Sequence, residues 1–274
     1  TPDGGSYFVM ELLDGVELSQ ELKRTGVIPY ERALTLLLQI LEALVAAHFL
    51  GKGQSILHLD LKPKNILLLP ANETRPEQIK VIDFGIGQFL GGDETDPLAM
   101  SEPSTEMPAV PAAVPVEKGT MTAVSTANTE AFNRRASKYS FEISRAYTAE
   151  YASPEQCGHI AFALGSKNEP VALDGRSDLY SFGVIAYELL TGRLPWKAPH
   201  IRELWLNIHQ ETPIQPWGDV EAKVPLPLRA FVERCLAKDR EQRFDDSREA
   251  LEALQRIANP ARTWRLVAAA VLFV

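Results

Sequence analysis

The longest apolar stretches of the chain repeat with helical spacing. The ranges that this pattern predicts as helices are 33–48, 177–190, 226–238 and 247–258. Residues 33–48 are apolar almost all round and follow Pro29, which suits a first helical turn, so they predict the buried central helix of a helical lobe. Ser177 and Asp178 form an N-cap-like pair, and Gly192 is typical of a helix end.

Shorter runs rich in β-branched and aromatic residues predict strands. Residues 6–11 form one such run, and residues 66–69 and 78–82 lie on either side of a turn-rich link, which favours an antiparallel hairpin. Asp14 and Gly15 mark a turn, after which a helix begins at Glu17–Leu18.

The composition is that of a soluble globular protein of one or two domains. The 274 residues are 45% hydrophobic and 23% charged, with a formal net charge of −8, which argues against nonspecific binding of nucleic acid. Cys157 and Cys235 form no CxxC pair, so we expect two buried, reduced thiols. The five histidines show no spacing typical of metal ligands.

Residues 91–137 lose periodicity and are dominated by Pro, Ala, Ser, Thr and Glu. Such a segment cannot bury enough apolar surface to offset its ordering entropy, so we expect disorder. Two interpretations stay open. The segment is either a tolerated surface insertion or a regulatory loop with autophosphorylation sites, whose phosphates nearby basic residues could bind. The candidate acceptors are Thr120, Thr122, Ser125 and Thr126, and the candidate basic residues are Arg134, Arg135 and Lys138.

A polar loop between two apolar runs holds the strongest candidate chemistry. Asp60 could accept a proton from a hydroxyl, Lys62 could neutralise phosphate charge, and Asn65 could offer an oxygen to a divalent cation. Asp83 ends the next β-branched run and could hold a metal that bridges phosphates. Phosphoryl transfer needs these groups together, because its catalysis consists mostly of positioning and charge stabilisation.

These residues resemble the motifs of the eukaryotic-type protein kinases. Residues 58–65 read HxDxKPxN, residues 83–85 read Asp-Phe-Gly, and Lys62, two positions after the aspartate, is the serine/threonine form. The resemblance implies an α+β, protein-kinase-like fold, mainly the α-helical C-lobe with the hinge and short β hairpins, and with the N-lobe largely absent. Leu59 stands where many kinases carry an arginine that meets a phosphorylated activation loop, so that switch is in doubt here.

The resemblance also implies the domain limits and further roles. Residues 1–262 would be the kinase domain, truncated at its N-terminus, with 91–137 inserted in the activation segment. The catalytic set would be Asp60, Lys62, Asn65 and Thr148, and Asn65 and Asp83 would bind the metal. Nucleotide binding would involve Met10 as gatekeeper, Glu11 and Leu13 at the adenine, Glu17 at the ribose, Leu67 as the pocket floor, and Asp83.

Further along, Ser153-Pro154-Glu155 resembles the Ala-Pro-Glu end of a kinase activation segment. The resemblance implies that Glu155 pairs with a buried Arg243 and that Tyr151 shapes the wall against which a substrate peptide lies. It also implies that Asp178, in the family's buried central helix, accepts hydrogen bonds from the backbone of the catalytic loop. His48 and His58 are expected to pack as scaffold residues.

The implied function is transfer of the ATP γ-phosphate to Ser or Thr of protein substrates, with Mg²⁺ or Mn²⁺, and with self-phosphorylation in residues 93–148. The chain has no counterpart of the Gly-rich loop or the strand lysine, so the fragment alone is expected to be inactive. Two alternatives stay open. A pseudokinase or scaffold would lack the strand lysine upstream, and a small-molecule kinase of the aminoglycoside or choline type would share only the HxDxxxxN-like loop.

The chain ends in a basic stretch followed by an apolar run. Arg262, Trp264 and Arg265 precede nine apolar residues, 266–274, which are fewer than the roughly 20 that a membrane span needs. Residues 264–274 are therefore either the start of a truncated transmembrane helix or a packed C-terminal helix. The arrangement resembles membrane-anchored bacterial kinases, which implies a cytoplasmic kinase domain tethered to the inner face of a bacterial plasma membrane.

Overall fold

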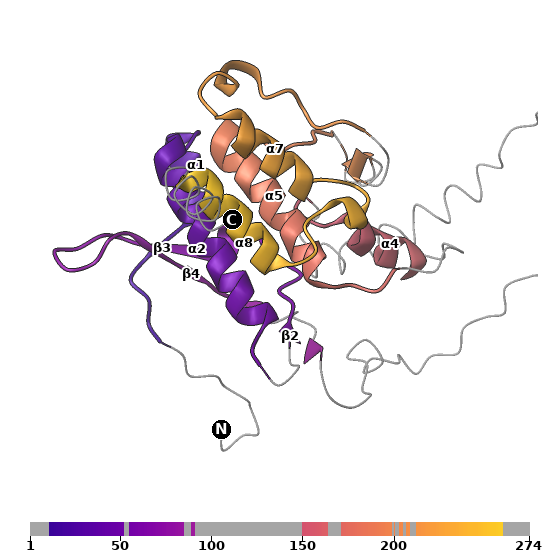
Figure 1. Cartoon of the computed structure of the whole chain (residues 1–274), viewed down its shortest axis with the longest axis horizontal. Coiled ribbons are helices and arrows are strands. Elements are labelled where there is room, and N and C mark those ends of the chain that lie inside the picture. Colours follow the sequence, from indigo (N-terminus) through magenta and orange to yellow (C-terminus); the bar gives the residue numbers. More distant parts are fainter. Residues whose placement is uncertain are drawn as a thin grey trace, which may run out of the picture.

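The computed structural model describes most of the chain outside the low-complexity segment and the two ends (Figure 1). The described residues are 11–51, 55–84, 89–90, 150–163, 171–198, 200, 203–204, 207–208 and 212–259. The predicted strand at 6–10, Met10, the 91–137 segment, Thr148 and the 264–274 tail therefore lie outside the described residues.

Helices are the longest regular elements of the described residues. They are α1 (Leu18–Thr25), α2 (Tyr30–His48), α4 (Pro154–Ala163), α5 (Gly175–Thr191), α7 (Leu226–Cys235) and α8 (Ser247–Ala258). Four of them, α2, α5, α7 and α8, pack side by side, and α4 lies near the N-terminal end of α5 (Figure 1). The predicted limits of α8 are confirmed, and α7 ends three residues earlier than expected.

The central helix of this bundle is α5, so the prediction that α2 takes that place is wrong. In α5, 13 of 17 residues are buried, whereas in α2 only 9 of 19 are. The outer face of α2 is covered by Thr35, Glu42 and Ala46, which are exposed. Alanine is tolerated at exposed positions as well as at buried ones. A count of apolar residues therefore overestimates how much of α2 is buried.

The caps of α5 also correct the expectation from sequence. The N-cap is Asp174, whose side chain accepts a hydrogen bond from the backbone N–H of Arg176, so Ser177 and Asp178 lie inside the first turn. This frees Asp178 for another role. At the other end Gly192 adopts the left-handed conformation with φ of 71°, as the sequence predicted for a helix stop.

Two small antiparallel sheets join the helical part. Strands β1 (Val16–Glu17), β3 (Ile66–Leu69) and β4 (Gln78–Val81) form one sheet in the order β1-β3-β4. The other pairs β2 (Ser55–Ile56) with β5 (Phe89–Leu90). The predicted hairpin is therefore confirmed. Gly15 is needed beside β1, because a Cβ there would lie 2.8 Å from the carbonyl oxygen of Leu68.

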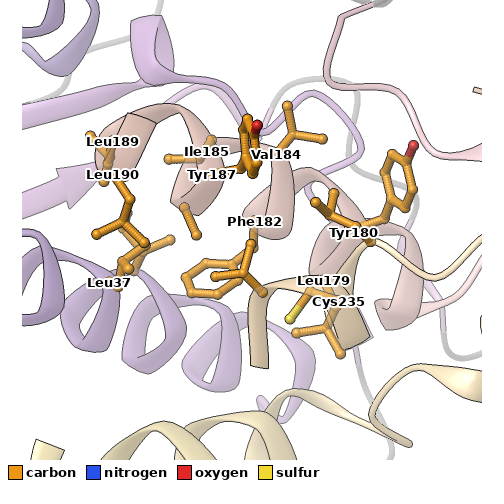
Figure 2. Close-up of a cluster of buried hydrophobic side chains, with 14 of the residues drawn as sticks. Leu37, Leu179, Tyr180, Phe182, Val184, Ile185, Tyr187, Leu189, Leu190 and Cys235 are labelled. Atoms are coloured by element: carbon orange, nitrogen blue, oxygen red, sulfur yellow. The ribbon is translucent and has the colours of Figure 1, made fainter. Parts of the chain in front are cut away.

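The hydrophobic core surrounds α5 (Figure 2). Phe182 packs edge-on against Phe231 of α7, and Tyr180 stacks on Trp196, with ring centroids 5.9 Å apart. Cys157 and Cys235 are free and buried, as the sequence predicted. None of the helices in the described part of the chain is long and apolar enough to cross a membrane.

Candidate active site

The polar loop between β2 and β3 gathers three of the predicted catalytic side chains. The ammonium of Lys62 lies 2.6 Å from Oδ2 of Asp60. The side-chain amide of Asn65 donates to the carbonyl oxygen of Asp60 at 2.9 Å and to its Oδ2 at 3.2 Å. The side chains of Asp60 and Lys62 are 13% and 18% exposed, so the carboxylate is held firmly and still reaches the surface.

A short turn makes this convergence possible. Pro63, Lys64 and Asn65 form a 3₁₀ turn that leads into β3, and the N–H of Asn65 donates to the carbonyl oxygen of Lys62. Proline suits the first position of such a turn because its φ is already fixed near the required value. The turn brings Asn65 back toward Asp60, five residues earlier in the chain.

The inner side of the loop is anchored by Asp178 of α5. Its two carboxylate oxygens accept hydrogen bonds from the backbone N–H groups of His58 and Leu59, both at 2.8 Å. The role predicted for Asp178 is thus confirmed. Leu59 has a positive φ of 59°, a conformation that costs a β- or γ-branched residue free energy and needs surrounding structure to hold it.

His48 extends this anchor toward α8. Its Nε2 lies 2.8 Å from Oδ2 of Asp178, and its Nδ1 lies 3.1 Å from Oγ of Ser247, the first residue of α8. All three side chains are buried. The sequence predicted that His48 packs in a helix but gave no sign of these partners, which lie 130 and 199 residues away.

His58 connects the loop with the Asp-Phe segment. Its Nδ1 accepts from the N–H of Asp60 at 3.3 Å, so Nε2 carries the proton that reaches the carbonyl oxygen of Ile82 at 3.1 Å. The imidazole also packs on Phe84, with centroids 4.5 Å apart. His58 is fully buried and acts as the scaffold residue that the sequence predicted.

Asn65 and Asp83, which the sequence predicts to hold a divalent cation, lie in segments joined by a backbone hydrogen bond. The N–H of Ile82 donates to the carbonyl oxygen of Asn65 at 2.9 Å, which ties the two motifs together. Asp83 is exposed and has a positive φ of 60°, while the amide nitrogen of Asn65 is engaged by Asp60, so its side-chain oxygen is the atom suited to a cation.

The donor set suits a divalent cation whose coordination is completed by other oxygen ligands. Among the described residues, no three His, Cys, Asp or Glu side chains gather into a group that could hold an ion. One carboxylate and one amide oxygen suit a hard divalent cation, which can complete its coordination with waters and with phosphate oxygens of the substrate.

The predicted nucleotide-binding residues that the structure describes lie around the three-stranded sheet. Glu17 of β1 is the register partner of Leu67 of β3, and Leu67 also pairs with Lys80 of β4. The Lys80 ammonium lies 3.8 Å from the Glu11 carboxylate, so the segment before β1 passes near this sheet. Leu13, which lies between Glu11 and β1 in the sequence, is partly exposed.

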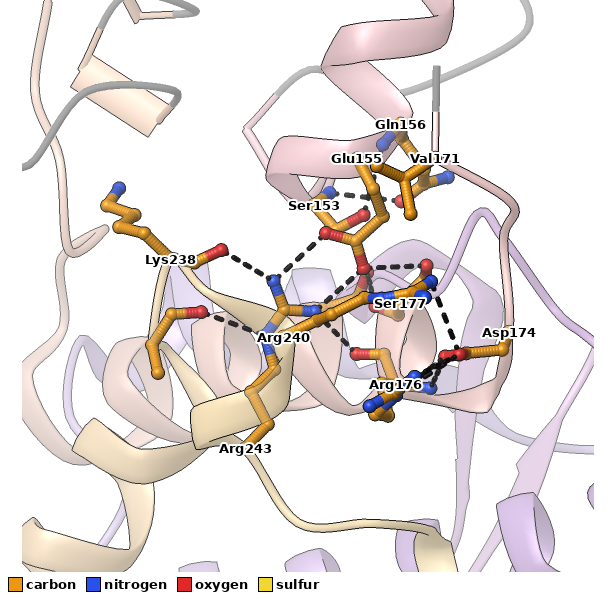
Figure 3. A network of polar contacts seen from close by, with 12 residues as sticks. Ser153, Glu155, Gln156, Val171, Asp174, Arg176, Ser177, Lys238, Arg240 and Arg243 are labelled. Carbon is orange, nitrogen blue, oxygen red and sulfur yellow. Dashed lines mark hydrogen bonds and ion pairs between the residues drawn. The ribbon is translucent and has the colours of Figure 1, made fainter. Parts of the chain in front are cut away.

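The end of the activation segment is fixed by a buried ion pair (Figure 3). Arg243 donates to both carboxylate oxygens of Glu155 at 2.7 and 3.0 Å, which confirms the predicted pair. Its remaining three N–H groups reach the carbonyl oxygens of Ala237, Arg176 and Lys238, so all five are satisfied. Burial raises the pKa of Glu155, but the hydrogen bonds from Arg243 outweigh it and hold that pKa below its usual value.

A capping box next to this pair was missed in the sequence. Ser153 precedes α4; its N–H donates to Oε1 of Gln156 at 3.0 Å, and its Oγ accepts from the N–H of Gln156 at 3.3 Å (Figure 3). The spacing Ser-x-x-Gln with Pro154 at the first helical position is the signal that could have revealed it. Gln156 also donates to the carbonyl oxygen of Leu59, at 2.6 Å.

Tyr151, predicted to shape the peptide wall, lies just before this cap. Its hydroxyl donates to Glu188 of α5 at 2.6 Å, and its carbonyl oxygen accepts from Ser181. Burial, and then the neighbouring Glu188 carboxylate, raise the pKa of Tyr151 far above its usual range. Its ring position is therefore fixed by α5, whereas a peptide contact stays a prediction.

Comparison with known proteins agrees with this geometry. Residues 3–108 match the family model described as the protein kinase domain. The match contains the catalytic loop and residues 83–85, and in the structure His58 and Asn65 of this loop contact Ile82 and Phe84. The fold and the site therefore define a protein kinase domain.

The relatives identify the type of kinase. Serine/threonine-protein kinase Pkn1 of Myxococcus xanthus is 32% identical over 249 residues, which cover 91% of this chain and 27% of the relative. Serine/threonine-protein kinase A of Synechocystis sp. is 29% identical over 258 residues (91% and 38%), and PknA of Mycobacterium tuberculosis is 29% identical over 264 residues (94% and 46%). The chain is a kinase domain of the bacterial, eukaryotic-type serine/threonine class, and it spans less than half the length of these relatives.

Proposed function

We propose that the protein containing this chain transfers the γ-phosphate of ATP to serine or threonine hydroxyls of protein substrates. The observation that carries the proposal is the convergence of Lys62 and Asn65 on the carboxylate of Asp60. The loop that holds them is fixed by α5 from the inside, so the three groups are preorganised before a substrate arrives.

In the proposed reaction the substrate hydroxyl oxygen forms a bond to the γ-phosphorus while the bond to the β,γ-bridging oxygen breaks, and ADP leaves. Asp60 orients the hydroxyl and accepts its proton. Lys62, 2.6 Å from Asp60, balances the negative charge of the transferring group. A magnesium ion held by Asn65 and Asp83 would neutralise charge on the phosphates.

The nucleotide would lie against the three-stranded sheet. The register pair of Glu17 and Leu67 supports a ribose contact from the first and an apolar floor under the adenine from the second. The backbone of Glu11 and Leu13 would meet the adenine edge, with Met10 behind it. We also propose Thr148 as a contact of Asp60 and Lys62.

The test is phosphate transfer by the full-length protein with Mg-ATP, read by mass spectrometry of phosphopeptides. Asp60→Asn keeps the size of the side chain and removes the base, so we expect kcat to fall by about 10²–10⁴. Asp219→Asn, on an exposed turn far along the chain, is the matched control and should leave kcat unchanged.

Each result decides between functions. Phosphate on Ser or Thr that disappears in Asp60→Asn supports the proposal, and its presence within residues 93–148 would support self-phosphorylation there. ATP binding with no transfer to any protein would favour a scaffold. Transfer to small molecules alone would replace the substrate class.

We further propose that the kinase domain lies in the cytoplasm and is tethered to the inner face of the plasma membrane. The support is sequence alone: Arg262, Trp264 and Arg265 come directly before the apolar residues 266–274. Fractionation of cells that express the full-length protein tests this, because a protein recovered only in the soluble fraction would contradict the tether.

A further inference from the structure

The peptide group between Leu59 and Asp60 is held at both ends, by a residue of the same loop and by a residue of α4. Its carbonyl oxygen, from Leu59, accepts a hydrogen bond from Nε2 of Gln156 at 2.6 Å. Its N–H, from Asp60, donates to Nδ1 of His58 at 3.3 Å. Because a peptide group is planar, fixing its two ends fixes the direction in which the chain enters Asp60.

The preceding peptide group is held as well. The N–H of Leu59 donates to Asp178 of α5, so Leu59 is gripped on one side by α5 and on the other by α4. This grip explains how a leucine stays at a φ of 59°, where a side chain other than glycine is rarely found. Without the bond from Gln156, the Leu59–Asp60 peptide would have one buried oxygen without a partner.

Gln156 is itself locked by the capping box. Its Oε1 accepts from the N–H of Ser153, its backbone N–H donates to Oγ of Ser153, and the side chain is buried. The amide group therefore has one orientation: the oxygen faces Ser153 and the nitrogen faces Leu59. The end of the activation segment thus reaches the catalytic loop through a neutral side chain.

We propose that Gln156 is a positioning residue for Asp60 and couples the end of the activation segment to the catalytic loop without a phosphate. This inference rests on the proposed kinase function, which makes Asp60 the base. Leu59 is buried and apolar, so it cannot meet a phosphate, and the coupling passes instead through its backbone carbonyl to Gln156. The orientation of Asp60 then depends on the folding of α4.

The experiment separates the cap from the bond in the full-length protein. Gln156→Glu keeps an oxygen for the N–H of Ser153, and a carboxylate suits the first turn of a helix, but it removes the donor to Leu59. Ser153→Ala does the reverse: it removes the hydroxyl from the cap and leaves the bond between Gln156 and Leu59. Gln156→Leu removes both.

Two readouts are needed, steady-state kinetics and hydrogen exchange of the peptide that contains residues 57–67. We expect Gln156→Glu to lower kcat about tenfold while the KM for ATP stays within about twofold, because one hydrogen bond to the loop is lost and the nucleotide contacts are not. Exchange at the Asp60 amide should rise in the same variant. Ser153→Ala should lower the melting temperature and leave kcat within about twofold.

Equal losses of kcat in Gln156→Glu and Ser153→Ala, in proportion to their losses of stability, would overturn the proposal, because both would then act only through folding of α4. Unchanged kcat and unchanged exchange in Gln156→Glu would overturn it as well. A wild-type protein that transfers no phosphate would refute the proposed function instead, and the exchange of the Asp60 amide would still decide whether Gln156 holds the loop.

Discussion

Arg243 and Arg32 each donate several guanidinium hydrogen bonds to carboxylates. The side chain of Arg243 is enclosed by protein, whereas water reaches the side chain of Arg32. The side chain of Arg243 is 0% exposed and pairs with Glu155, whereas that of Arg32 is 32% exposed and lies between Glu21 and Glu77. The first network fixes α4 to the segment before α8. The second fixes α2 to α1 and to the chain just before β4.

Glu155 and Glu21 are both buried, and they differ in the cause that dominates the pKa of each carboxylate. Burial works against the charge of Glu155, and only the bonds from Arg243 keep its pKa low. In Glu21, hydrogen bonds from Arg24 and then Arg32 dominate and lower the pKa to about 2. Glu155 therefore depends on one arginine that is fully enclosed, whereas Glu21 has two arginine partners that water reaches.

The largest expected effect comes from breaking the buried network. Arg243→Met leaves the Glu155 carboxylate buried without its partner, so we expect the free energy of unfolding to fall by about 3–5 kcal/mol. Urea denaturation measures this. The double variant Arg243→Met, Glu155→Gln removes the uncompensated charge and should recover part of the loss; no recovery would show that packing, not charge, dominates.

A smaller loss is expected at the surface network. Arg32 donates to Glu77 at 2.9 and 2.7 Å and also contacts Glu21. Arg32→Met should cost about 1–2 kcal/mol, less than Arg243→Met, because Arg24 still pairs with Glu21 and water reaches the side chain of Glu77, which is 27% exposed. Adding 0.5 M salt should shrink the cost for Arg32 and leave that for Arg243 nearly unchanged. Equal salt sensitivity would remove the distinction between the two networks.

The pH dependence sharpens the same comparison. The folded pKa of Glu21 is about 2 and its ordinary value is 4.5, so its contribution to stability is complete above about pH 4.5 and is lost as the pH falls toward 2. Over that range the difference in stability between wild type and Glu21→Gln should shrink, starting from about 1 kcal/mol. A difference in the free energy of unfolding between the two proteins that stays constant from pH 5 to pH 3, measured by urea denaturation, would contradict this.

The smallest effect on stability is expected for an exposed ion pair that belongs to neither network. Arg229 reaches Glu221 at 2.6 Å, but the Glu221 side chain is 58% exposed. Glu221→Ala should change the free energy of unfolding by less than about 0.5 kcal/mol, since an exposed pair is largely screened. A loss as large as that of Arg32→Met would mean that distance, not burial, sets the strength of these pairs.

Features set by neighbours in sequence were predictable here. The limits of α8 and the hairpin of β3 and β4 follow from local periodicity and turn residues. The catalytic loop could also be assigned, because Asp60, Lys62 and Asn65 lie within six positions and their contacts are local. The family resemblance supplied the longer links, those of Asp178 and of Glu155 with Arg243.

Contacts between distant segments were not predictable. The bond from Gln156 to Leu59 spans 97 residues, and that from Arg32 to Glu77 spans 45. The local sequence around these residues does not determine which surfaces meet, because that depends on how the helices pack. The exposure of α2 was misjudged for the same reason: an alanine such as Ala46 fits either a core or a surface, and only the neighbouring elements decide.

The labelling rates of the two buried thiols can report how fast two parts of the protein open. Cys157 lies in α4, where burial raises its pKa to about 12, and Cys235 lies in α7, where a Cβ on Gly183 of α5 would come within 2.7 Å of its own Cβ. A thiol reagent can react only after the surrounding structure separates. Labelling of Cys157 would time the release of the activation-segment helix, and labelling of Cys235 would time the parting of α5 and α7, so one reaction mixture reports both rates.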